Sequence, residues 1–221
     1  MIHPYEYSIV VVAREHNPTL LNPDFLERNG IVRADWGWEV DRDALLTTPP
    51  YSRVRYTSGV LIESESQRFK AAIHDPGEYP LEYPVADIVR EYVKVIKHVA
   101  YTAIGINFHG YIPDSDPLRT LLSSFAAPDL ENRLAPTAYT FTVQTVRRKD
   151  ALVGLRVAEG TRTADEERKE PIIDVRANYH RELESSSAVV RIAEILDGVK
   201  NDWDDFYDVV RALGLERTTA Q

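Results

Sequence analysis

Residues 101–111 read Tyr-Thr-Ala-Ile-Gly-Ile-Asn-Phe-His-Gly-Tyr, and we expect the fold to be organised around this stretch. Apolar and non-apolar residues alternate along it, which predicts a β-strand with one face toward a core and the other away from it. The stretch lies at the middle of the 221 residues. It is therefore expected to begin a second half of the chain that repeats the organisation of the first.

Residues 1–100 show the pattern of a strand, a short helix, three strands and a longer helix. The first strand, at 7–14, is nearly continuous in apolar and β-branched residues, as in a strand buried within a sheet. Asn22, Pro23 and Gly30 are typical of the cap, the first turn and the end of a short helix. The remaining three strands and the helix with one apolar face are expected at 51–57, 60–65, 68–74 and 85–99.

Residues 101–221 repeat this order. After the strand at 101–111, Asp116 and Pro117 predict the start of a second short helix. A long amphipathic helix is expected from 185 to about 213, and Gly198 weakens its middle by about 1 kcal/mol relative to alanine, which favours a kink or break there. Between the helices, three strands are expected at 139–147, 151–158 and 172–183, and a charged loop is expected at 159–170.

These patterns predict the fold class. We expect an α+β protein in which tandem β-α-β-β-β-α halves, residues 1–100 and 101–221, form one curved antiparallel sheet with the helices on one face. Neither set of three strands can bury its apolar face alone, so the two halves are expected to form one compact unit. The second face of the sheet would then be open.

The order of elements resembles the pseudo-twofold saddle of the TATA-binding-protein-like fold. This resemblance covers most of the chain by topology, rests on no specific motif, and implies an internal duplication. The strand at 172–183 and the helix after it also resemble the C-terminal part of sporadically distributed, uncharacterised bacterial proteins, which implies a bacterial origin. The chain lacks the basic sheet face of DNA-binding saddles, so the resemblance implies a fold and not DNA binding.

Composition excludes several classes of protein. The hydrophobic content of 43% and the charged content of 28% are ordinary for a globular protein, and the net charge of −9 argues against a broad phosphate-binding surface. The absence of cysteine excludes disulfides, thiolate metal sites and cysteine nucleophiles. No run of about 18 apolar residues and no secretory signal pattern is present, so we expect a cytoplasmic protein with no membrane contact.

The open face of the sheet is the candidate binding surface. In the strand at 101–111, alternation sends Ile104, Ile106 and Phe108 inward and sends Tyr101, Asn107, His109 and Tyr111 outward. Asn-Phe-His at 107–109 is echoed by Asn-Tyr-His at 178–180. The predicted open-face binding residues are Asn107, His109, Tyr111, Arg156, Asp174, Arg176, Asn178 and His180.

The open face suggests two further chemistries. His109 and His180, with Asp174 or Glu182, could ligate a divalent metal, because neutral imidazole and carboxylate suit such ions. Two histidines without fixed spacing are more simply polar residues of a solvated face, so no metal ligand and no cofactor is assigned.

A basic turn at 147–149 offers the second chemistry. Arg156, Arg176 and Arg181 could extend this turn into a nucleic-acid contact. A solvated hairpin end is the simpler interpretation.

The last helix is the candidate partner surface. The sequence contains no glycine-rich phosphate loop, HExxH motif or nucleophile elbow, so no catalytic residue is assigned. The leading hypothesis is a non-catalytic binding or assembly protein that contacts a protein partner or a second copy of itself as a homo-oligomer. Nucleic-acid binding through Arg147, Arg148, Arg156 and Arg176, and a metal-assisted enzyme using His109 and His180, are the alternatives. The predicted partner-helix residues, spaced three and four apart, are Val189, Ile192, Leu196, Trp203 and Phe206.

Overall fold

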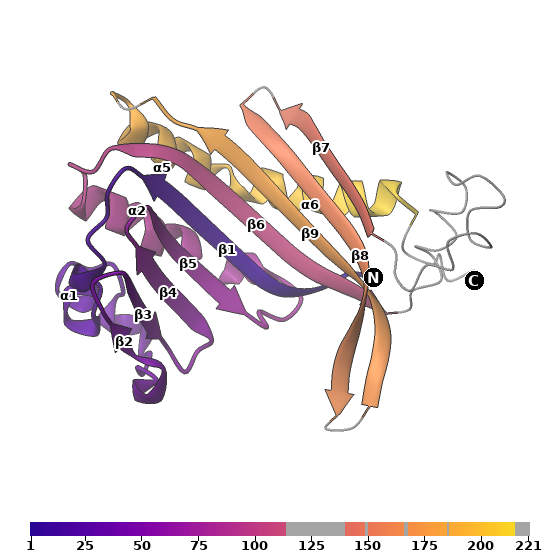
Figure 1. The fold of residues 1–221 in the computed structure, drawn as a ribbon, viewed down its shortest axis with the longest axis horizontal. Helices are drawn as coiled ribbons and strands as arrows, with labels where there is room; N and C mark the ends of the chain where they lie inside the picture. Colours follow the sequence, from indigo (N-terminus) through magenta and orange to yellow (C-terminus); the bar gives the residue numbers. More distant parts are fainter. Residues whose placement is uncertain (114–139, 149, 166–167, 185, 215–221) are drawn as a thin grey trace.

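The computed structural model describes residues 1–113, 140–148, 150–165, 168–184 and 186–214. It confirms the α+β class, with one antiparallel sheet of nine strands in the order β2-β3-β4-β5-β1-β6-β9-β8-β7 (Figure 1). The strands are β1 (His3–Ala13), β2 (Leu46–Thr47), β3 (Tyr51–Arg55), β4 (Val60–Glu65), β5 (Arg68–His74), β6 (Tyr101–Pro113), β7 (Thr140–Arg148), β8 (Ala151–Asp165) and β9 (Arg168–Glu182). The helices are α1 (Pro23–Arg28), α2 (Val85–Val95), α5 (Ala188–Asp197) and α6 (Val199–Ala212).

The central strand predicted from residues 101–111 is β6, which lies between β1 and β9. Its inward side chains Ile104, Ile106 and Phe108 are fully buried. Phe108 meets Trp203 and Phe206 of α6, with ring centroids 5.1 Å and 5.7 Å apart. The apolar half of the alternation therefore packs the middle of the sheet against the last helix.

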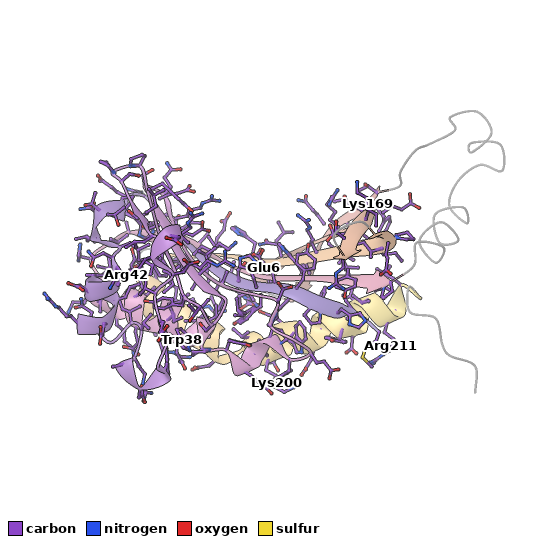
Figure 2. The ribbon with its side chains drawn as sticks, turned by 90° about the horizontal axis from the view of Figure 1, so that it is seen from below. Glu6, Trp38, Arg42, Lys169, Lys200 and Arg211 are labelled. Carbon is purple, nitrogen blue, oxygen red and sulfur yellow. The ribbon has the colours of Figure 1, made fainter. Side chains whose placement is uncertain are left out.

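One face of the sheet is covered by helices and the other is open. Figure 2 shows a curved sheet with Glu6 on the concave side and with Lys200 and Arg211, both of α6, on the opposite side. Helix α2 packs on β5 and β1 and also contacts α5, so it lies on the same covered face. The concave face is left uncovered by these helices (Figure 2). None of the helices in the described ranges is long and apolar enough to cross a membrane.

Local sequence signals explain where the helices begin and end. The Asn22 side chain accepts a hydrogen bond from the backbone N–H of Phe25 at 2.8 Å, Pro23 occupies the first turn of α1, and Gly30 follows the helix with φ of 67°. At the other end of the chain, Gly198 closes α5 and opens α6. The long helix expected from 185 to 213 is therefore divided at the glycine.

The loop predicted at 159–170 is wrong. Residues of this segment continue β8 and β9 as a paired two-stranded ribbon, which projects beyond the rest of the sheet (Figure 1). The pairing places Arg162 opposite Glu170, and opposite charges facing each other across two strands stabilise such a ribbon. The alternating charges are therefore those of two paired strands and not of a loop. The β-branched residues Thr161 and Thr163 indicated a strand in this segment.

Tyr101 also requires a correction, because it is fully buried and does not lie on the open face. The pairing of β1 with β6 shifts register between Val12 and Ala13, and Tyr101 lies opposite Ala13 at this irregularity. Its hydroxyl donates to the carbonyl of Ile96 at 3.2 Å. A register shift reverses the face of the residues beyond it, which alternation alone cannot predict. The second short helix, predicted from Asp116 and Pro117, lies outside the described residues.

Candidate functional site

Strand register places the predicted binding residues in rows across β6, β9 and β8. The first row joins Asn107 and Asn178, the second joins His109, Arg176 and Arg156, and the third joins Tyr111 and Asp174. Because directly paired residues project to the same face, all these side chains belong to the concave surface. His180 lies opposite Gly105 and Leu152, at the other end of the same face.

An amide row crosses the centre of this surface. The Nδ2 of Asn178 donates to the Oδ1 of Asn107 at 2.5 Å, and the Nδ2 of Asn107 contacts the hydroxyl of Ser8 at 3.4 Å. Gly154 continues the row on β8, where an added Cβ would meet no atom within 4 Å. Side-chain amides carry both donors and acceptors, so the row can exchange hydrogen bonds with a polypeptide laid over it.

Glu6 forms a charged cluster beside the amide row. Its carboxylate accepts from the Nζ of Lys70 at 2.8 Å and lies 3.7 Å from the Nδ1 of His109 and 3.8 Å from the Nδ1 of His74. Burial alone would raise the pKa of the Glu6 carboxyl, but the bonds from His109 and Lys70 outweigh it and hold that pKa well below its ordinary range. Glu6 is therefore ionised and compensated by its neighbours on the sheet.

Asp174 forms a second cluster at the end of β9 nearest the ribbon. It is 9% exposed and accepts from the hydroxyl of Tyr5 at 2.7 Å, from the Nε of Arg176 at 2.8 Å and from the Nη1 of Arg156 at 3.4 Å. Burial and the bond to Asp174 raise the pKa of Tyr5, which stays protonated as a donor. One nearly buried carboxylate thus orients two guanidinium groups.

The two histidines of the metal hypothesis do not meet. His109 lies opposite Arg176 and His180 lies opposite Gly105, so they are separated by four residues along the ladder. At about 3.3 Å per residue this separation is about 13 Å, too far for one ion to contact both rings. Within the residues that the structure describes, no group of three or more His, Asp or Glu side chains could hold a metal ion.

The basic surface proposed for nucleic acid is only partly brought together. Arg147 and Arg148 lie on β7, and Lys149 lies outside the described residues. Arg181 is a correction: it is 6% exposed, faces the helices, and donates to both carboxylate oxygens of Asp202 on α6, at 2.9 Å and 3.0 Å. It shares the inward face of β9 with Tyr179, as alternation requires.

The partner-helix surface needs the same kind of correction. Ile192, Leu196, Trp203 and Phe206 are all buried in the chain's own core, and Val189 is partly buried against it. The apolar seam of α5 and α6 therefore packs on the convex side of the sheet. Its residues are therefore not available to a partner.

Sequence reasoning missed Tyr5, Glu6 and Lys70, which complete the two charged clusters. Tyr5 is the extra residue in a register shift of β1 between Pro4 and Glu6, so the outward positions at the start of this strand do not follow simple alternation. Lys70 could have been assigned by counting outward positions in the strand at 68–74. Tyr5 and Glu6 carried no such signal, because a bulge is not visible in the hydrophobic pattern.

No protein-family model, curated protein or solved structure matches this chain. A functional assignment therefore depends on what the side chains of the concave face can contact.

Proposed function

We propose that this protein is a non-catalytic binding protein that receives another polypeptide chain on its concave sheet face. The observation that carries the proposal is the division of the sheet into one face covered by α2, α5 and α6 and an opposite, concave face that these three helices leave uncovered (Figure 2). Antiparallel sheets can leave one face to solvent, and here the nine strands of the described residues form one continuous sheet. The proposed partner is either a second copy of this chain or a different protein.

The chemistry of the face favours a polypeptide over nucleic acid. Glu6 pairs with Lys70, and Asp174 pairs with Arg156 and Arg176, so acids are interspersed among the cations of the surface. Phosphate-backbone binding requires clustered, uncompensated cations, and the chain as a whole carries a net charge of −9. The amide row of Asn107 and Asn178 instead offers paired donors and acceptors of the kind that peptide groups use.

We also propose that residues 1–100 and 101–221 are tandem halves of one unit, with the saddle organisation that the sequence resembles. The support is the order of strands outward from the centre: β1 is followed by β5, β4 and β3, and β6 is followed by β9, β8 and β7. The cysteine-free sequence supports a cytoplasmic location, because a chain without disulfides does not need an oxidising compartment.

Gly154 provides a steric test of the binding face. Gly154→Trp adds a large side chain over the amide row, at a position with open space above it and no need for positive φ, so the fold should accept it. We expect this variant, purified gently from the protein's own cells, to lose its polypeptide partner in native mass spectrometry.

Val190→Trp is the matched control, because Val190 is 65% exposed on α5 and lies outside the proposed surface. The control variant should keep the partner that wild type retains. A wild-type protein that is a bare monomer, or equal partner loss in both variants, would contradict the proposal.

A further inference from the structure

A hollow of about 460 Å³ lies at the corner where the β8–β9 ribbon leaves the sheet. Its walls come from Tyr5 on β1, Asp75 just after β5, Tyr111 on β6, and the start of the ribbon on β8 and β9. Figure 1 shows the ribbon turning away beside the end of β6. A volume of this size is typical of sites for small molecules.

Three arginines line this hollow. Arg156 and Arg176 have side chains 47% and 48% exposed, so their guanidinium groups reach solvent while remaining tied to Asp174. Arg162 completes the set from the ribbon, with its Cζ 4.6 Å from the centroid of the Tyr111 ring and a hydrogen bond to the hydroxyl of that residue. Each guanidinium is thereby fixed in direction before any ligand arrives.

Asp174 holds Arg156 and Arg176 without using all of their N–H donors. Asp174 is nearly buried and lies beneath Arg156 and Arg176, where it takes one N–H from each. A guanidinium has five N–H donors, so both groups keep donors directed to solvent. The lining of the hollow has as many acids as arginines. A ligand is therefore recognised by the directed N–H donors of the guanidinium groups and not by an excess of positive charge.

Two further acids, Asp75 and Glu159, line the hollow and restrict what can enter. Each would repel a polyanion that extends past the three arginines, such as a nucleic-acid strand. A single compact oxyanion can instead contact the planar guanidinium forks, which match carboxylate and phosphate groups. The surroundings thus select a small ligand with one localised anionic group.

We propose that this hollow is a binding site for the carboxylate or phosphate group of a small ligand, held by Arg156 and Arg176 with Arg162 at the ribbon. Asp174 and Tyr5 are positioning residues that orient the two arginines. The site is separate from the amide row, and its occupation does not require a polypeptide partner.

The test is a thermal-unfolding titration of the purified chain with inorganic phosphate and, separately, with succinate, at constant ionic strength maintained by sodium chloride. We expect at least one of them to raise Tm by about 3 °C at ten times its dissociation constant. A response to phosphate alone would assign a phosphate ligand, and a response to succinate alone a carboxylate ligand. A response to both would assign a general oxyanion site.

Arg176→Gln should weaken this binding by about tenfold or more, because a hydrogen bond to a charged group is lost. Arg55→Gln is the control, since it removes the same charge from the exposed end of β3, outside the hollow. The proposal is overturned if neither anion raises the Tm of wild type, or if Arg176→Gln responds as strongly as Arg55→Gln. Because this titration contains no partner protein, its failure would leave the polypeptide-binding proposal intact.

Discussion

Asp202→Asn is expected to lower the free energy of unfolding by about 3–5 kcal/mol. Asp202 on α6 accepts from both terminal nitrogens of Arg181 on β9, and both side chains are buried. The substitution removes the buried carboxylate and leaves the guanidinium with Asp150, a half-exposed acid 3.4 Å from its Nε. Urea unfolding followed by circular dichroism measures the change.

Asp204→Asn is the control for the loss of an acid from the same helix. Asp204 pairs with Lys200 four residues earlier, and both side chains are largely exposed. Exposed pairs of this kind contribute little, so this variant should unfold like wild type. Equal stability of the Asp202 and Asp204 variants would show that Arg181 does not face α6.

Phe206→Ala is expected to destabilise the protein by a similar amount, about 3–5 kcal/mol. Phe206 is 1% exposed and packs against Phe108 of the central strand and Trp203 of its own helix, with ring centroids 5.7 Å and 5.8 Å apart. Truncation removes aromatic contacts from both elements and leaves a cavity between sheet and helix. The measurement is again urea unfolding, with sedimentation velocity to report assembly.

Val190→Ala removes an exposed apolar side chain from α5 and should change stability by no more than about 0.5 kcal/mol. Comparing Phe206→Ala with Val190→Ala shows whether the apolar seam of α5 and α6 packs inside the chain or against another molecule. If Phe206 instead contacted a partner, Phe206→Ala would dissociate an oligomer and leave the stability of the monomer near that of Val190→Ala.

Much of the fold could be predicted because its local signals agree with its long-range contacts. Alternation at 101–111 identified the central strand, and Asn22, Pro23 and Gly198 marked where helices begin or divide. These signals act over a few residues and are not overridden by packing. The same pattern misassigned Tyr101, because the register shift opposite Ala13 depends on the neighbouring strand and not on Tyr101 itself.

The partner of the apolar seam could not be read from sequence. A helix stripe with spacing of three and four is the same whether it packs on its own sheet or on another molecule. One sequence feature did indicate that the helix packs on its own sheet. Asp202 lies within the stripe formed by Val199, Trp203 and Phe206, where a buried acid requires a partner. Arg181, at an inward position of β9, was that partner.

The candidate site was predictable in its strands and less so in its chemistry. Asn107 and Asn178 were correctly expected to share a face, because both follow simple alternation on neighbouring strands. His109 and His180 were expected on that same face too, but their distance depends on register, which the sequence does not encode locally. The two charged clusters depend on Tyr5 and Glu6, which a bulge in β1 places on the open face.

Photo-crosslinking from two single-cysteine variants tests the role of the concave face most directly. The chain has no cysteine, so Gln144→Cys, exposed on β7 opposite Gly154, and Val190→Cys on α5 would each carry one benzophenone label. With the labelled proteins returned to lysate of the protein's own cells, we predict a crosslinked adduct of defined mass from position 144 and none from position 190. Adducts from position 190 alone, equal adducts from both positions, or no adduct from either would contradict a partner-binding concave face.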